Sequence, residues 1–239
     1  MTLKYSETFF SAQGEGQYVG IPSLWMRFFL CNLQCNGFGQ KDPTNPDTYE
    51  LPYETIDITN IDSVFDLPVF DKGCDSSYTW SKKYKHLITD KTVEEAVDEL
   101  TALLPHGKFV HPVTQQNAHM VFTGGEPMLQ LDGKLIEECK NSAFDTAIET
   151  NGTIPIDFDI DWVCVSPKHG SELVVKHGNE LKAVFPQEGQ NLETFLNLDF
   201  EHLYLQPMDG IDGKENTTKT IQYCLEHPEW KLSIQQHKL

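Results

Sequence analysis

The sequence has no uninterrupted apolar run near the roughly 20 residues that a helix needs to cross a bilayer, so a membrane-spanning protein is excluded. Its first ten residues, MTLKYSETFF, lack the charged start, apolar stretch and cleavage site of a secretory signal. We therefore expect a cytoplasmic protein. The sequence also lacks the G-x-G-x-x-G and Walker patterns that are typical of dinucleotide- and phosphate-binding loops.

Basic residues are scarce. Lys and Arg total 18 against 36 Asp and Glu, which gives a net charge of −18. A field of that sign repels phosphate backbones, so we expect no nucleic-acid partner. Arg27 is the single arginine of the chain. Its guanidinium can hold a carboxylate at two points, which a lysine cannot do. Arg27 is therefore predicted to bind a specific anionic group, with a structural ion pair as the alternative.

Low-complexity segments and internal repeats are also missing, and apolar residues recur along nearly the whole chain of 239 residues. One domain, 1–239, is therefore the simplest prediction. Apolar runs rich in β-branched and aromatic residues predict strands, at 23–29, 118–124, 146–150, 161–166, 181–185, 202–206 and 231–235. Helices are predicted at 92–104, 133–142, 191–196 and 215–227. Alternating strands and helices favour an α/β fold with a parallel sheet, as either a partial (β/α) TIM-like barrel of about six or seven strands or an open doubly wound sheet.

The six cysteines belong to two groups. Without an export signal, disulfides are the weaker interpretation. Cys139, Cys164 and Cys224 lie in apolar or helical contexts and are predicted to be small buried residues. Cys31 and Cys35 stand on one loop just after a predicted strand, a spacing that suits two metal ligands.

Residues 36–73 interrupt the alternating pattern. The segment has four prolines, eight acidic residues and two lysines, with no helical or strand period. A stretch this long without structure is usually functional or disordered. We expect a cover or partner surface that docks on the body through Tyr49, Phe65, Leu67, Val69 and Phe70; an unconstrained loop without a role is the alternative.

Short clusters of Gly, Pro and polar residues follow successive predicted strands: FTGGEP, ETNG, SPK and QPMD, with QQHKL at the end of the chain. In α/β folds the carboxyl ends of strands carry the functional loops. In FTGGEP, Gly124 and Gly125 allow a close approach of the backbone to a ligand. Glu126 offers a carboxylate to an ammonium group. These strand ends are therefore predicted to surround one ligand site.

Together these motifs resemble a known family. The matching segments are SAQGEGQYVGIPSLWMRFFLCNLQC near the start, CDSSYTW at 74–80, FTGGEPMLQ at 122–130, ETNGT at 149–153, SPK at 166–168, ELK at 180–182, LQPMDG at 205–210 and LSIQQHK at 232–238. In this order and spacing they are similar to the 7-carboxy-7-deazaguanine synthases of the radical S-adenosylmethionine (radical SAM) superfamily. The resemblance implies a lyase of 7-deazapurine (queuosine-type) biosynthesis, which uses a 5′-deoxyadenosyl radical to convert 6-carboxy-5,6,7,8-tetrahydropterin into 7-carboxy-7-deazaguanine with loss of ammonia.

The cluster motif departs from the family pattern C-x3-C-x2-C, because Phe38 stands where the third cysteine would fall. The residues that normally follow that cysteine come instead after Cys74. The resemblance thus implies a 4Fe–4S cluster on Cys31, Cys35 and Cys74, with 36–73 as an insertion and one iron left open for S-adenosylmethionine. A structural zinc site, which needs a fourth protein ligand, is the weaker alternative.

The resemblance also implies the remaining site residues and partners. S-adenosylmethionine is expected to contact Phe38, Gly73, Asp75, Gly124, Gly125, Glu126, Ser166, Pro167, Lys168, Gln206, Pro207, Met208 and Asp209. The pterin substrate is expected to contact Ala12, Gln13, Gly14, Glu15, Arg27, Thr123 and His237, and Mg²⁺ is expected at Ser76. No residue is expected to act as a conventional acid or base. A flavodoxin-like electron donor and a homodimer are expected as well. Another radical SAM activating enzyme and a non-catalytic binding protein on the same fold are the competing interpretations.

Overall fold

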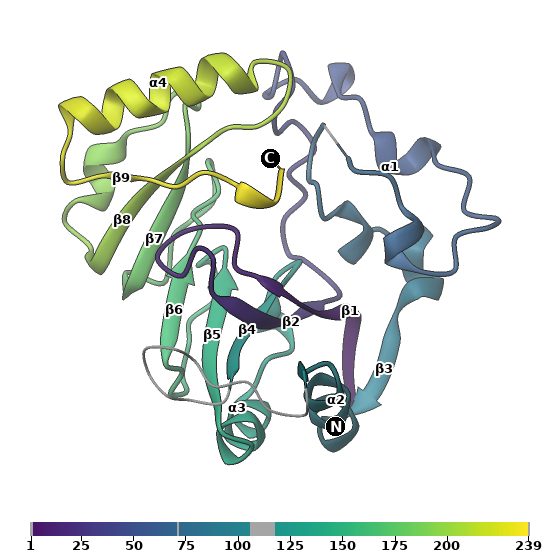
Figure 1. Ribbon diagram of the computed structural model, residues 1–239. Coiled ribbons are helices and arrows are strands. Elements are labelled where there is room, and N and C mark those ends of the chain that lie inside the picture. The colour runs from purple at the N-terminus through teal and green to yellow at the C-terminus, as the bar shows by residue number, and fades with distance from the viewer. Residues whose placement is uncertain (1, 71, 106–117, 239) are drawn as a thin grey trace.

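The computed structural model describes residues 2–70, 72–105 and 118–238, with the His237 side chain left out. These residues form a nine-stranded sheet in the order β3-β1-β2-β4-β5-β6-β7-β8-β9 (Figure 1). The strands are β1 (Thr2–Ala12), β2 (Pro22–Phe28), β3 (Thr89–Thr92), β4 (Ala118–Gly124), β5 (Phe144–Thr150), β6 (Trp162–Val165), β7 (His177–Phe185), β8 (Asp199–Pro207) and β9 (Lys231–Leu232).

Seven of these strands, β2 and β4 to β9, pair in parallel and coincide with the seven predicted strands. The sheet begins at β3 and ends at β9 without closing, so it forms an incomplete barrel, as predicted. The sequence did not predict β1 and β3, which extend the sheet antiparallel to β2 and to β1. Their apolar signal is weak. Ser6, Glu7 and Thr8 interrupt the apolar residues of β1, and the sequence of β3 is TDKT.

Four α-helices accompany the sheet in the described residues: α1 (Pro52–Thr55), α2 (Val93–Ala102), α3 (Gly133–Asn141) and α4 (Gly213–Glu226). Thr92 and Glu95 form a capping box at the start of α2. The predicted helix at 191–196 is a 3₁₀ turn, Leu192–Phe195. Among the residues that the structure describes, no helix is long and apolar enough to span a membrane.

The two faces of the sheet have different contents. Leu24, Met26 and Phe28 of β2 point outward into the main core, which α2 and α3 cover. Because side chains alternate along a strand, Trp25 and Arg27 point to the inner face. There Trp25 packs in a small cluster with Val121 and Ala147. The inner face is therefore only partly filled with apolar side chains, which leaves space for polar groups.

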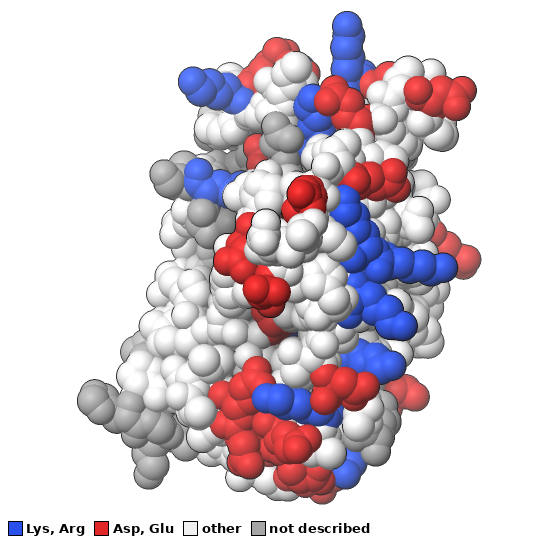
Figure 2. Space-filling model, turned by 90° about the vertical axis from the view of Figure 1, so that its right-hand side faces the viewer, with Lys and Arg blue, Asp and Glu red and all other residues white. Residues whose placement is uncertain are grey.

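The segment 36–73 forms a small core together with the segment that follows it. It contains the 3₁₀ turns Pro46–Thr48 and Val64–Asp66 as well as α1. Tyr53 and Phe70 are buried against Tyr84 of the following segment. The expected docking residues Phe65 and Val69 are instead 71% and 86% exposed. Figure 2 views this side of the molecule, where acidic and basic side chains are interspersed.

The two ends of the segment 36–73 lie side by side. The Gly73 amide donates to the Phe38 carbonyl at 2.8 Å. Gly73 has φ +75°, and a Cβ there would lie 3.0 Å from the Asn36 carbonyl oxygen, so glycine is required for this approach. The backbone itself therefore brings the neighbours of Cys35 and Cys74 together.

Candidate active site

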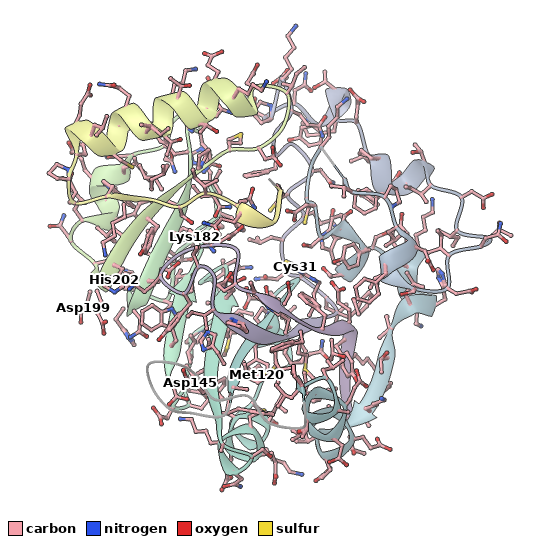
Figure 3. All side chains as sticks on the ribbon, in the orientation of Figure 1. Cys31, Met120, Asp145, Lys182, Asp199 and His202 are labelled. Carbon is pink, nitrogen blue, oxygen red and sulfur yellow. The ribbon has the colours of Figure 1, made fainter. Side chains whose placement is uncertain are left out.

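A cavity of about 440 Å³ lies at the carboxyl ends of the parallel strands. Among the predicted site residues whose side chains the structure describes, all line it except Glu126, Pro167 and Met208. Figure 3 shows Cys31 and Lys182 in the interior of the molecule, whereas Asp145 and Asp199 lie at the amino ends of β5 and β8. The volume is typical of a site for small molecules. The strand-end motifs therefore meet at one place, as the sequence predicted.

The three predicted cluster ligands line the same cavity, and all six cysteines are free thiols. Burial raises the pKa of the Cys31 and Cys35 thiols, and the ammonium of Lys168 opposes this rise. Burial also raises the pKa of the Cys74 thiol to about 12. Among the described residues, no three metal-binding side chains converge closely enough to hold a single ion. Cluster ligands need no such convergence, because each cysteine binds a different iron.

Unpartnered polar atoms gather around these cysteines. Six buried side-chain N or O atoms of the described residues lack a hydrogen-bond partner. Four of them belong to Asn36, Ser77, Trp80 and Gln206: Asn36 follows Cys35, Ser77 and Trp80 follow Cys74, and Gln206 lines the cavity. Buried polar groups without partners are costly. Three thiols and these polar groups are therefore a donor set that fits a 4Fe–4S cluster and a polar cofactor.

Gly124 and Gly125 line the cavity, and neighbouring backbone lies so close to both that there is no room for a side chain. A Cβ at Gly124 would lie 2.5 Å from the Phe28 carbonyl oxygen, and one at Gly125 would lie 2.0 Å from that of Leu30. The Gly125 amide donates to the Phe28 carbonyl, and the Glu126 amide to that of Leu30. The two glycines thus hold the end of β4 against the chain that leads into Cys31.

Glu126 is not free to bind an ammonium group in this structure. It is fully buried, and its carboxylate accepts hydrogen bonds from the Thr150 hydroxyl and the Asn151 and Met128 amides, at 2.7, 2.8 and 3.0 Å. Burial raises the pKa of Glu126, an effect that these donors oppose. The carboxylate therefore ties the β4 loop to the end of β5, and its contact with the cofactor stays a prediction.

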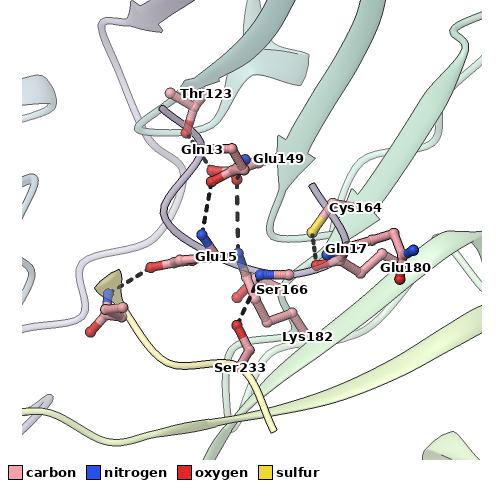
Figure 4. Close-up of polar contacts among 12 residues, drawn as sticks. Gln13, Glu15, Gln17, Thr123, Glu149, Cys164, Ser166, Glu180, Lys182 and Ser233 are labelled. Atoms are coloured by element: carbon pink, nitrogen blue, oxygen red, sulfur yellow. Dashed lines mark hydrogen bonds and ion pairs between the residues drawn. The ribbon is translucent and has the colours of Figure 1, made fainter. Parts of the chain in front are cut away.

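A buried ionic network forms the other end of the cavity (Figure 4). Lys182, on β7, forms ion pairs with Glu15 and, at 3.8 Å, with Glu149. Glu149 also accepts hydrogen bonds from Gln13 Nε2 and Thr123 Oγ1, both at 3.2 Å. Burial disfavours the charged ammonium, but the carboxylates of Glu15 and Glu149 raise the pKa of Lys182 well above its ordinary value. Three of the predicted substrate residues thus meet on one charged cluster.

Glu180 supports the loop that carries Gln13 and Glu15. Its buried carboxylate accepts the Gln17 amide at 3.0 Å and the Cys164 thiol at 3.4 Å. Gly16 has φ +66°, a conformation that favours glycine, and a Cβ there would lie 2.1 Å from Glu180 Oε1 and displace that carboxylate. The last glycine of the QGEG motif is therefore explained by the carboxylate beneath it.

Arg27 forms the structural ion pair that was the alternative prediction, and it also lines the cavity. Its Nε donates to Glu7 Oε1 at 2.6 Å, and Glu7 also accepts from the Tyr78 hydroxyl at 2.9 Å. One terminal nitrogen lies 3.4 Å from Ser76 Oγ, and the guanidinium lines the cavity. Glu7 thus holds the guanidinium of Arg27 at Nε, and the residue also lines the cavity.

The end of the chain crosses the mouth of the cavity. Gln235 Nε2 donates to Glu15 Oε1 at 2.7 Å, and the Gln236 amide donates to the Gly14 carbonyl at 3.0 Å. Lys238 forms an ion pair with Asp209 at 2.8 Å. The side chain of His237 lies outside the described part of the structure.

Sequence reasoning missed several residues of this site. Lys182 and Glu149 lie within the quoted ELK and ETNGT motifs, but nothing in the sequence indicates that Lys182 pairs with Glu15 and Glu149. Glu7 and Tyr78 were missed as partners of Arg27. A polar residue beside Arg27 could have been sought on β1, had that strand been predicted.

Comparisons with known proteins agree with this geometry. No protein-family model matches the chain. The chain is 38% identical over 238 residues to 7-carboxy-7-deazaguanine synthase of Bradyrhizobium diazoefficiens, covering 100% of this chain and 98% of the relative. It is 36% identical over 238 residues to the synthase of Burkholderia multivorans and 37% identical over 240 residues to that of Caulobacter vibrioides, with the same coverage.

The crystal structure of QueE from Escherichia coli matches the fold with a TM-score of 0.65 and 22% sequence identity, covering 99% of this chain and 95% of that one. The likeness shows that the incomplete barrel is the architecture of that enzyme. The cysteine cavity, the motifs around it and the full-length relatives lead to one conclusion: this chain belongs to the 7-carboxy-7-deazaguanine synthases, radical SAM lyases that use a 4Fe–4S cluster, S-adenosylmethionine and Mg²⁺.

Proposed function

We propose that the cavity performs the family's reaction with its cofactors at one end and the pterin at the other. Cys31, Cys35 and Cys74 hold the 4Fe–4S cluster, and the strand ends at 124–125, 166–168 and 206–209 receive S-adenosylmethionine. When bound, these two groups supply the one-electron chemistry that removes a hydrogen atom from 6-carboxy-5,6,7,8-tetrahydropterin. The observation that carries the proposal is that three thiols, the QGE loop and the single arginine line one cavity.

The protein's own residues orient the substrate. The carboxylates of Glu15 and Glu149 face the cavity and can accept from the guanidine-like edge of the pterin, while Gln13 and Thr123 set the direction of Glu149. Arg27 receives the substrate carboxylate on its terminal nitrogens. Fixed donors and acceptors of this kind hold the reacting atoms in place without a strong acid or base.

Ser76 is proposed as a ligand of Mg²⁺. Its hydroxyl donates to Asp75 Oδ1 at 3.1 Å and lines the cavity beside Arg27. Mg²⁺ prefers six oxygen ligands and usually keeps several waters. Ser76, Asp75, water and the substrate carboxylate together supply oxygen ligands of this kind.

The segment 36–73 is proposed to cover the cluster. Its ends meet at Gly73 and Phe38, and Gly39 packs against Gly210 at the end of the QPMDG motif, where a Cβ on Gly210 would lie 2.7 Å from the Gly39 carbonyl oxygen. A cover fixed at both the cluster loop and β8 excludes water and oxygen from the cavity. It also belongs to the single domain, 1–239, that we propose.

Anaerobic turnover tests the proposal. The reconstituted protein is mixed with 6-carboxytetrahydropterin, S-adenosylmethionine, a chemical reductant and Mg²⁺, and 7-carboxy-7-deazaguanine and ammonia are quantified. Wild-type protein is expected to form both, whereas Glu149→Gln is expected to bind S-adenosylmethionine normally but to show a raised KM for the pterin. Full activity of Glu149→Gln at low pterin concentration would contradict the assignment of the substrate end.

We further propose a flavodoxin-like electron donor, a homodimer and a cytoplasmic location, all of which the resemblance to the family supports. Light scattering of the purified protein tests the dimer. Turnover with reduced flavodoxin in place of the chemical reductant tests the donor.

A further inference from the structure

Tyr78 connects the turn that follows Cys74 to the arginine of the cavity. Its hydroxyl donates to Glu7 Oε1 at 2.9 Å, and the same oxygen accepts from Arg27 Nε at 2.6 Å. Glu7 and Arg27 lie opposite each other in the β1–β2 pairing, and the side chain of Glu7 is only 9% exposed. Two donors on one oxygen, one of them charged, hold the carboxylate in a single orientation.

The ring of Tyr78 is held from its other side. It is partly buried and packs against the small core of Tyr53, Phe70 and Tyr84, which the segment 36–73 forms with the segment that follows it. A tyrosine side chain rotates about two bonds only, so a packed ring directs its hydroxyl to one place. The small core therefore supports the hydrogen bond to the Glu7 carboxylate.

This arrangement decides which nitrogens of Arg27 can bind a ligand. Nε carries a single hydrogen, and Glu7 accepts it, so an incoming carboxylate binds at the terminal nitrogens. One terminal nitrogen lies 3.4 Å from Oγ of Ser76, the residue that begins the 3₁₀ turn of Tyr78. The guanidinium is therefore fixed relative to the same turn at two points, directly at Ser76 and through Glu7 at Tyr78.

We propose that Tyr78 is a positioning residue that sets the specificity for a pterin with a carboxylate at position 6. It holds Glu7 on Nε of Arg27, and the guanidinium then keeps the orientation in which its terminal nitrogens bind the substrate carboxylate. The inference rests on the proposed function, which assigns that carboxylate to Arg27. It also gives the small core of the segment 36–73 a part in substrate binding, because this core packs against the Tyr78 ring.

Tyr5 is a matched control on the same strand as Glu7. Its hydroxyl donates to Glu99 Oε2 at 2.8 Å, so Tyr5→Phe also removes one hydrogen bond from a tyrosine to a glutamate. Tyr5 is 1% exposed and belongs to the main core, and neither Tyr5 nor Glu99 lines the cavity. The two variants therefore differ only in whether the lost hydrogen bond leads to Arg27.

The test compares two fluorescent probes that differ only in the carboxylate, 6-carboxypterin and pterin. Their dissociation constants are measured anaerobically with reconstituted wild type, Tyr78→Phe and Tyr5→Phe, in the presence of S-adenosylmethionine and Mg²⁺. Wild type and Tyr5→Phe are expected to bind 6-carboxypterin about 100-fold more tightly than pterin. In Tyr78→Phe this preference is expected to fall about tenfold, with little change in the affinity for pterin.

The ratio of the two dissociation constants separates positioning from a general structural role, which would weaken the binding of both probes alike. Equal ratios in wild type and Tyr78→Phe, or equal losses in the two variants, would overturn this inference alone. Wild type that binds both probes equally well would contradict the carboxylate clamp of the proposed function as well.

A second measurement uses the single arginine of the chain, in case Tyr78→Phe does not retain its cluster. Metal-free protein labelled with ¹⁵N-arginine gives one Nε–H signal in the NMR spectrum, which belongs to Arg27. Its hydrogen is expected to exchange slowly with water in wild type and in Tyr5→Phe, and about tenfold faster in Tyr78→Phe, where the Glu7 carboxylate has lost its second donor. Equal exchange rates in all three proteins would show that Tyr78 does not hold this pair and would overturn the proposal.

Discussion

The two ends of the cavity differ in how their polar groups are satisfied. At the pterin end, Lys182, Glu15, Glu149 and Gln13 pair with one another inside the protein. At the cluster end, the thiols are free, and the side chains of Asn36, Ser77 and Trp80 present buried polar atoms without partners. The pterin end is therefore built before any ligand arrives, whereas the cluster end has a donor set that a metal cluster completes.

This difference predicts two kinds of response to mutation. A substitution at the cluster end should leave the folding of the apoprotein nearly unchanged and remove the cofactor. A substitution at the pterin end should destabilise the apoprotein, because it leaves a buried charge without its partner. Measuring stability and iron content on the same variants therefore separates the two ends.

The largest effect is expected at Cys74. Cys74→Ala removes one of three proposed ligands, so the reconstituted protein should lose its four-iron content and all turnover, while its urea unfolding curve without metal stays close to that of wild type. Iron and sulfide analysis with the absorption spectrum measures the loss. Cys224→Ala, on α4 and outside the cavity wall, is the control that should keep the cluster. A full complement of iron in Cys74→Ala would refute the assignment.

The next effect is expected at Lys182. Lys182→Met leaves the partly buried carboxylates of Glu15 and Glu149 without their cation, and breaking a buried pair costs about 3–5 kcal/mol. The free energy of unfolding of the apoprotein in urea measures this cost. Lys219→Met breaks the exposed pair with Glu215, whose atoms are 2.7 Å apart, and should leave the stability close to that of wild type. If Lys182→Met lowers the free energy of unfolding no more than Lys219→Met does, the network adds no stability.

A smaller and local effect is expected in the segment 36–73. Phe70 is 5% exposed and packs near Tyr84, with ring centroids 6.5 Å apart, whereas Phe65 is 71% exposed. Phe70→Ala should cost about 3 kcal/mol within this small core, which corresponds to roughly 100-fold faster amide exchange across the segment. Phe65→Ala should exchange like wild type. If both variants exchange alike, the segment has no core of its own.

The same pair of phenylalanines shows where sequence reasoning stops. Parallel strands were predictable because each is a short apolar run that ends in a turn motif, and the strand ends then meet by geometry. Phe65 and Phe70 lie in a segment without any period, so nothing in the sequence distinguishes the exposed ring from the buried one. The 3₁₀ and α-helical turns of this segment are likewise too short to leave a pattern.

The site residues that could be predicted are those that belong to short sequence motifs. Cys31, Cys74 and the QGEG loop stand in local patterns, and the structure places them in one cavity. Pairings between distant strands were not predictable. Glu7 lies opposite Arg27 in the β1–β2 register, and the polar sequence of β1 conceals that strand. Lys182 meets Glu15 only after β7 and the loop that follows β1 have packed together.

The smallest effect is expected at Arg27, and it tests whether the pterin end extends to the substrate carboxylate. Arg27 binds Glu7 through Nε and lines the cavity. A lysine ammonium can satisfy one of these partners but not both in the same fork geometry. Arg27→Lys should therefore keep its cluster and its affinity for S-adenosylmethionine, while kcat/KM for the carboxylated pterin falls about 10- to 100-fold, or roughly 1.4–2.7 kcal/mol. Glu7→Gln keeps an acceptor for Nε and should show a smaller rise in KM. Steady-state kinetics with both variants measures these changes, and an Arg27→Lys enzyme as efficient as the parent would place the carboxylate clamp elsewhere in the cavity.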